Sequence, residues 1–149
     1  MMAGSQGPDR RAKMAAVSEL IRKEGNGVIS FGDHTLSAKA KIEDFDVDGN
    51  LYKVKTFKEL TKLERDGMFV YESEPGTSVN DFEVIPNGVS FKVCGDEDAM
   101  ITVGLKEDTE YSVNIAGRDI GRIRTNLGGK LSISVELEGK GEISVKVVE

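Results

Sequence analysis

Apolar residues recur at every second position through most of the C-terminal half of this chain. The alternation covers the segments 82–85, 89–93, 100–105, 111–115, 119–123, 131–137 and 143–148. A period of two places successive side chains on opposite faces of a strand, so that one face meets a core and the other meets water. Turn residues such as Pro86-Asn87-Gly88 and Ala116-Gly117 separate the segments. The pattern predicts a mainly β protein with an antiparallel, Ig-like β-sandwich of about seven strands.

Residues 15–77 predict further strands joined by hairpin turns. Alternating segments lie at 41–47, 51–57, 60–64 and 68–72. The turn signals between them include Asp48-Gly49 and Asp66-Gly67, which favour tight hairpins. An earlier hairpin is expected between strands at 28–31 and 35–38, with its turn about Gly32-Asp33.

The sequence also predicts how the chain is divided. Residues 1–14 are rich in Gly, Ser, Pro and Arg and predict a disordered tail. Apolar residues at positions 17, 20 and 21 predict a short helix over 15–23, ended by the glycines that follow. The turn residues at 75–78 predict a boundary between a strand-rich segment, 15–77, and the β-sandwich, 78–149.

Composition limits the partners that this chain is expected to bind. The 149 residues carry a formal net charge of −6, which repels a nucleic-acid backbone. No run approaches the roughly eighteen apolar residues of a membrane span. Cys94 is the only cysteine, so an internal disulfide or a site with several thiolate ligands is excluded. The first residues lack the apolar stretch of a secretory signal, and we expect a cytoplasmic protein without nucleic-acid or membrane partners.

No segment matches a catalytic or metal-binding motif. The segment 46–50 has oxygen-bearing side chains at alternate positions, but it lacks the glycine and acid spacing of a calcium loop and predicts a turn. Three acids at 96–98 predict a solvated loop between strands. His34, the only histidine, is expected at the surface beside Asp33. The sequence therefore predicts no metal, no cofactor and no enzymatic activity.

Three arginines form the candidate binding site. Arg118, Arg122 and Arg124 lie close together, and Arg122 and Arg124 share one face if 119–125 is a strand. Two guanidinium groups on one exposed face can hold a carboxylate or a phosphate. The alternative is that both arginines pair with glutamates on a neighbouring strand. Tyr111 is a further candidate contact, because tyrosines on loops can bind sugars.

Three stretches of the chain, 19–36, 51–77 and 123–137, resemble a group of small bacterial proteins labelled "endosialidase". The resemblance covers nearly everything from about residue 15 onward. The label implies a glycosidase that cleaves sialic acid polymers. Sialidase catalytic domains are large β-propellers with an arginine triad and repeated boxes that contain Trp. This chain has no Trp, and none of its positions matches a catalytic residue of that family.

From these observations we expect a non-catalytic, β-rich module that acts through protein contacts, as a homo-oligomer. Strands at the edges of a sheet offer unpaired backbone groups to a partner. The alternative is an accessory module for a carbohydrate or an anion, such as an acidic saccharide, with Arg118, Arg122, Arg124 and Tyr111 as contacts.

Overall fold

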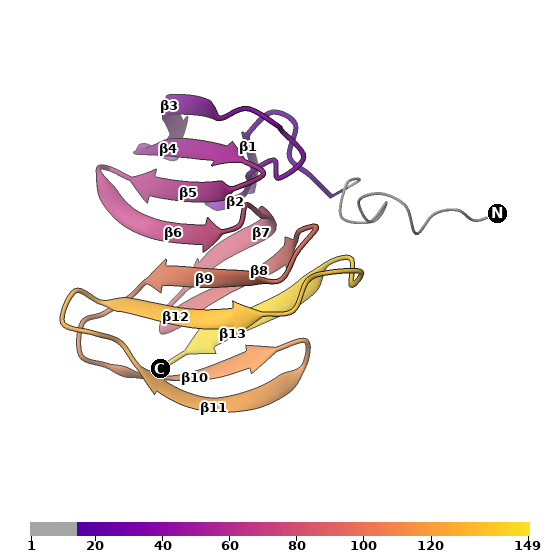
Figure 1. The fold of residues 1–149 in the computed structure, drawn as a ribbon. Coiled ribbons are helices and arrows are strands. Elements are labelled where there is room, and N and C mark those ends of the chain that lie inside the picture. Colours follow the sequence, from indigo (N-terminus) through magenta and orange to yellow (C-terminus); the bar gives the residue numbers. More distant parts are fainter. Residues whose placement is uncertain (1–14) are drawn as a thin grey trace.

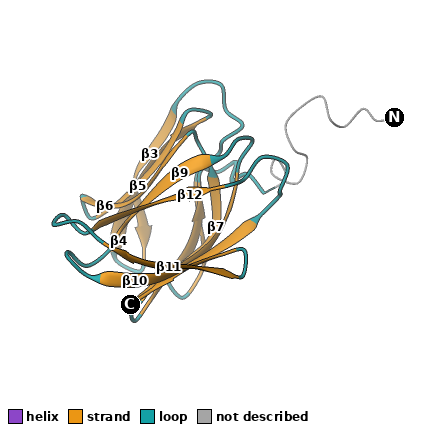
Figure 2. Ribbon diagram, turned by 60° about the horizontal axis from the view of Figure 1, so that its bottom comes forward, coloured by secondary structure: helices purple, strands orange, loops and turns teal. Residues whose placement is uncertain are grey.

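The computed structural model describes residues 15–149, which form two antiparallel β-sheets and contain no helix (Figures 1 and 2). The seven-stranded sheet contains, in spatial order, β1 (Ile21–Gly25), β2 (Val28–Phe31), β7 (Ser78–Ile85), β8 (Gly88–Cys94), β13 (Ile143–Val148), β10 (Glu110–Ile115) and β11 (Arg118–Arg124). The six-stranded sheet contains β12 (Lys130–Val135), β9 (Ala99–Gly104), β6 (Met68–Glu74), β5 (Leu60–Arg65), β4 (Asn50–Phe57) and β3 (Ala40–Val47).

The two sheets bury one apolar core between them, in a sandwich-like arrangement. In Figure 1 the six-stranded sheet faces the viewer, from β3 at the top to β12 below, with β7 and β8 behind it. Four aromatic side chains fill the middle of the core, and their rings meet edge to face or stacked: Phe31, Tyr71, Phe82 and Phe91. Fully burying such a side chain contributes about 1.5–3 kcal/mol. The predicted alternation therefore gives most strands one buried face. The segment 119–123 is an exception, because β11 has no buried residue and Ile120 is 48% exposed.

Tight turns set the register of several hairpins. Asp48-Gly49, Asp66-Gly67 and Ala116-Gly117 have positive φ at both residues, which is the geometry of two-residue type I′ turns. Their twist matches that of the flanking strands, so the pairing partner of each strand follows directly. All three turns were predicted from the sequence.

A chain of buried hydroxyl groups holds the segment that crosses from β6 in one sheet to β7 in the other. Thr61 Oγ1 donates to Thr77 O at 2.7 Å and accepts from Thr77 N at 3.1 Å. The Thr77 hydroxyl contacts Tyr71 Oη and Ser73 Oγ, each at 2.7 Å. Thr56 Oγ1 lies 2.8 Å from Thr61 Oγ1 and extends the chain into β4. Every member is buried, so these bonds satisfy polar groups that water does not reach.

Two predictions about the N-terminal part are wrong. The predicted helix at 15–23 is a turn followed by β1, because Asn26-Gly27 forms a hairpin turn that pairs β1 with β2. Cross-strand pairing outweighs the weak helical spacing of a nine-residue segment. The predicted strand at 35–38 is a loop. The chain leaves β2 at Gly32, where φ is +92° and a Cβ would lie 2.6 Å from Thr77 O.

The architecture also differs from a seven-stranded Ig-like sandwich. The strands of 78–149 are present, five in one sheet and two in the other, but they do not form a sandwich by themselves, because both sheets also contain strands from 15–77. The pairs β2–β7 and β6–β9 join the two predicted segments. The predicted tail, 1–14, lies outside the described residues.

Replacing Thr61 with Val tests the hydroxyl chain at the crossing. Val keeps the shape of Thr but leaves the buried N–H and C=O of Thr77 without a partner, which costs about 2 kcal/mol in the free energy of unfolding. The measurement is urea denaturation followed by circular dichroism. Thr102→Val is the matched control, since Thr102 bonds Ser132 on the exposed face of the same sheet. Equal stability losses in the two variants would contradict the role given to Thr61.

Candidate binding surfaces and a buried polar cluster

The predicted arginine pair lies on the outer face of β11, an edge strand. Arg124 and Arg122 are opposite Glu110 and Ser112 of β10. Arg122 Nε donates to Glu110 Oε1 at 2.8 Å, and its Nη1 donates to Ser112 Oγ at 2.6 Å. Arg124 Nη1 donates to the Asp108 backbone carbonyl at 3.0 Å and lies 3.3 Å from the Asp108 carboxylate. Both guanidinium groups are thus engaged by carboxylates of the chain itself.

Electrostatics supports this pairing. The hydrogen bond from Arg122, together with its charge, holds the pKa of the Glu110 carboxyl below its ordinary value. Glu110 stays ionised and remains a partner of Arg122 through the neutral pH range. A ligand anion at this face would have to displace the glutamate, which makes the pair a weak free site.

The other two predicted contacts do not join this face. Tyr111 points inward from β10 and is only 2% exposed. Its hydroxyl accepts a hydrogen bond from the backbone N–H of Lys106 at 3.2 Å. Arg118 is exposed at the other end of β11, opposite Ile115. The structure therefore brings Arg122 and Arg124 together and separates Tyr111 and Arg118 from them.

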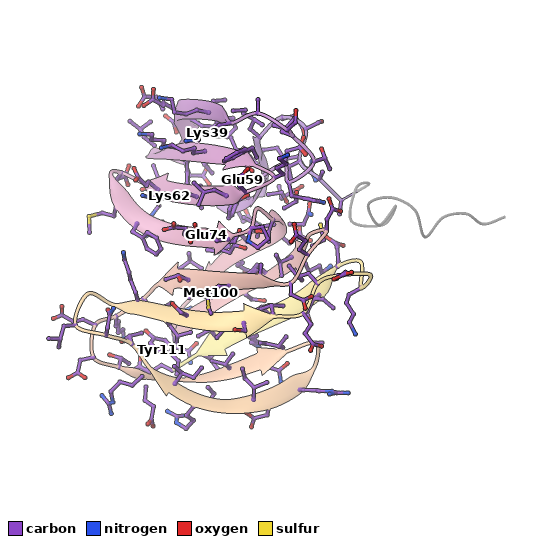
Figure 3. The ribbon with its side chains drawn as sticks, viewed as in Figure 1. Lys39, Glu59, Lys62, Glu74, Met100 and Tyr111 are labelled. Atoms are coloured by element: carbon purple, nitrogen blue, oxygen red, sulfur yellow. The ribbon has the colours of Figure 1, made fainter. Side chains whose placement is uncertain are left out.

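A row of three lysines crosses the outer face of the six-stranded sheet, and sequence reasoning missed it. Lys41 of β3 lies opposite Lys55 of β4, and Lys55 lies opposite Lys62 of β5. Like charges directly opposite one another destabilise a sheet. Figure 3 shows Lys62 on this face, with Lys39 near one end of the strands. We call Lys41, Lys55 and Lys62 the lysine row.

The neighbouring side chains leave the centre of the row uncompensated. Lys41 lies 3.9 Å from Glu43, and Lys62 lies 3.6 Å from Glu64. Lys55 forms no ion pair with any residue in the described part of the chain. A shallow depression beside it, lined by Lys53, Lys55, Lys62 and Glu64, has a volume of about 20 Å³. A space of this size holds about one water, so this depression holds no small-molecule ligand.

A buried polar cluster lies where the loop after β2 meets the crossing from β6 to β7. His34, expected at the surface, is 2% exposed, and Ser78 is fully buried. The Ser78 hydroxyl lies 2.6 Å from His34 Nδ1 and accepts a hydrogen bond from His34 N at 3.2 Å. His34 Nε2 faces Asp96 Oδ1 at 3.7 Å. Neither His34 Nε2 nor Asp96 Oδ1 has a hydrogen-bond partner among the described residues.

This cluster contains the residue types of a catalytic triad but lacks the access that catalysis needs. A nucleophilic serine must reach a substrate carbonyl, whereas Ser78 has no exposed surface. Burial lowers the pKa of His34, and the charges of Asp96 and Asp33 oppose that shift only in part. The ring is neutral at pH 7 and packs as part of the core. Cys94 is buried nearby, and its Sγ lies 3.7 Å from Ser78 O.

Comparison of the chain with protein-family models, curated proteins and solved structures finds no match. Over residues 15–149, no three His, Cys, Asp or Glu side chains gather closely enough to hold a metal ion. The same residues include no helix with the length and apolar character needed to cross a membrane.

Acidification is expected to weaken the fold through His34. Because the folded-state pKa of His34 lies below its value of 6.5 in the unfolded chain, the unfolded state binds more protons between the two values. The stability is present above pH 6.5 and is lost as the pH falls toward the folded pKa. Denaturation of the wild type and of His34→Gln between pH 7.5 and 5.5 measures this. The wild type should lose more stability over that range, and parallel curves for the two proteins would remove His34 as the cause.

Charge reversal in the lysine row is expected to stabilise the protein. Lys55→Glu places a carboxylate between Lys41 and Lys62, and replacing repulsion with attraction contributes about 0.5 kcal/mol. Urea denaturation at low salt measures the gain, which should shrink in 1 M NaCl because salt screens exposed charges. Lys146→Glu on β13 makes the same change in net charge opposite Ser90 and Asn114. A gain of the same size in this control would show that net charge alone is responsible.

Proposed function

We propose that this chain is a non-catalytic, cytoplasmic β-module that associates with a second copy of itself through the edge of β12. Four strands have only one neighbour: β1 and β11 in the seven-stranded sheet, and β3 and β12 in the six-stranded sheet. Each offers backbone N–H and C=O groups to a partner strand.

Three of these edges carry features that hinder pairing. The registers of β1 with β2, β3 with β4, and β10 with β11 are each interrupted by an irregularity. In β3 the irregularity includes Asp44, with φ of +57°, and in β11 it lies close to Gly121, with φ of +112°. Bulges and charged side chains are features by which native proteins protect an edge.

The β12 edge is regular, and this observation carries the proposal. All six of its residues pair with β9 without interruption. Along two antiparallel strands, residue pairs that exchange backbone hydrogen bonds alternate with pairs that do not. Gly129 and Leu105, just outside the two strands, are a hydrogen-bonded pair, because Leu105 N donates to Gly129 O. Counting from this pair, every second residue of the strand is bonded to β9. The alternation directs the backbone groups of Ser132 and Ser134 away from β9. Both side chains are small, uncharged and exposed.

Apolar surface beside the edge adds to this argument. Met100, opposite Ser134 on β9, is 49% exposed on the outer face (Figure 3). Leu127, in the turn that leads into β12, is 81% exposed. Pairing of two β12 strands about a two-fold axis would join two six-stranded sheets into one and cover part of this surface.

The alternative function, an accessory module for an anion or an acidic saccharide, is also favoured by a specific observation. That observation is the lysine row rather than the predicted arginine face, because Arg122 and Arg124 are already paired with Glu110 and Asp108. The two functions use different parts of the six-stranded sheet and are compatible.

A proline in β12 tests the proposed association. Of the backbone groups, Ser132→Pro removes only an outward N–H and leaves the ladder with β9 in place. It also removes the side-chain bond to Thr102. Size-exclusion chromatography with light scattering, over a hundredfold range of concentration, should show a wild-type dimer and a monomeric variant. Ser132→Ala, which keeps the N–H but loses the bond to Thr102, should remain a dimer.

If the proline variant does not fold, Ser132→Lys with Ser134→Lys replaces it. A monomeric wild type, or a proline variant that still dimerises, overturns the proposal.

A further inference from the structure

We propose that the lysine row binds a linear acidic polysaccharide, with its carboxylate or sulfate groups on the amines of Lys41, Lys55 and Lys62. The inference specifies the site and the ligand class of the alternative function above, and it rests on that function alone. It requires no pairing of β12.

The first step of the argument is the cost of the row to the protein without a ligand. Its three lysines lie in consecutive cross-strand register, where mutual repulsion is strongest. Three other cations of the chain are neutralised more closely: Lys23 lies 2.7 Å from Asp48, Lys106 lies 2.7 Å from Glu149, and Arg122 lies 2.8 Å from Glu110. Lys53 and Lys92 lie 3.7 Å from their acids, about as far as Lys41 and Lys62 do from theirs, so the row is distinguished by the register of its three lysines. A bound anion would remove this repulsion. Binding an anion is therefore more favourable at the row than at a single isolated lysine.

The second step concerns the shape of the ligand. Adjacent strands lie about 4.8 Å apart, so the row spans about 10 Å in a straight line across the sheet. The depression within it is too small for a compact molecule. A ligand must therefore lie along the face and present charges at intervals of about 5 Å, roughly one sugar residue in an extended chain. A linear polymer with one acidic group per sugar meets both conditions.

The third step distinguishes a polysaccharide from a nucleic acid. Duplex DNA carries one charge per about 1.7 Å of its axis. That spacing is about a third of the distance of about 4.8 Å between adjacent strands, so most of its phosphates would face no lysine of the row. The row ends at Glu72 of β6, opposite Lys62. Beyond it lie hydroxyls, Thr102 and Ser132, which suit sugars. The aromatic ring beside the row, Phe57, has the Lys39 amine over it, 5.7 Å from its centre, and this cation competes with a stacking base for the ring.

Titration calorimetry at low salt tests the site with four probes. These are chondroitin sulfate, polygalacturonate, neutral dextran and a duplex DNA oligonucleotide. The wild type should bind at least one of the two acidic polysaccharides, more tightly than the oligonucleotide, and should not bind neutral dextran. Lys55→Gln should raise the Kd about tenfold, since one charge-assisted contact is lost. It should also lower the slope of log Kd against log salt by about one.

Two control variants locate the contact. Lys146→Gln makes the same charge change on the outer face of the other sheet and should change the Kd less than about twofold. Arg122→Gln with Arg124→Gln tests the predicted arginine face and should have a similarly small effect. Circular dichroism of each variant establishes that it is folded.

Different failures have different meanings. If the wild type binds neither acidic polysaccharide, both the site and the alternative function are overturned. If it binds them but Lys55→Gln and Lys146→Gln weaken binding equally, or the arginine variant weakens it more, the site is overturned while the function stands. Tighter binding of the oligonucleotide overturns the ligand class.

Discussion

The whole arrangement depends on one crossing, at which the chain leaves β6 in the six-stranded sheet and enters β7 in the other. The segment passes through the interior, where an unpaired backbone group is costly. The Thr61 hydroxyl pairs both backbone groups of Thr77, because it donates to Thr77 O and accepts from Thr77 N. Because Tyr71 and Ser73 bond the Thr77 hydroxyl, the crossing is tied to β5 and β6 together. The position of β7 then sets where β2 and β8 pair, and thereby the seven-stranded sheet.

Local signals in the sequence predicted the strands well and their partners poorly. Asp48-Gly49 and Asp66-Gly67 determine tight turns by backbone preference alone, so the β3–β4–β5–β6 order was readable. The pairing of β9 with β6, which places strands of 15–77 and of 78–149 in one sheet, was not readable, because it depends on the whole core. The helix prediction failed for the same reason: Ile21 has an apolar spacing that suits a helix, but β2 offers it a paired and buried position.

The candidate sites likewise contain features that the local sequence predicts and features that depend on tertiary contacts. The shared face of Arg122 and Arg124 follows from a spacing of two, and that part was predictable. Glu110, which engages Arg122, lies on the strand that the predicted Ala116-Gly117 turn pairs with β11, as the alternative of cross-strand pairing expected. The register irregularity in this hairpin and the contact with Asp108 in the preceding loop were not readable from the local pattern. The lysine row depends on the register of three consecutive strands: Lys41 comes opposite Lys55 only because the irregularity between Ile42 and Phe45 shifts the pairing of β3 with β4, and no local signal predicted that irregularity. His34 was expected at the surface because it follows an aspartate in a turn-like segment. Its burial depends on Ser78, forty-four residues away.

The two proposed surfaces gain meaning when they are considered on one sheet. Three lysines alone give weak binding, because three contacts that each change the Kd about tenfold correspond to a Kd of about 1 mM. If β12 strands pair about a two-fold axis perpendicular to the sheet, both lysine rows lie on the same outer face. The two β5 strands are then separated by seven strand spacings, roughly 30 Å. A polymer long enough to span that distance can engage both rows, and the second contact forms at a high effective concentration. In this arrangement, association through Ser132 and Ser134 brings two weakly binding lysine rows together into one bivalent site. The regular edge of the sheet would then be what makes the lysine row an effective binding surface.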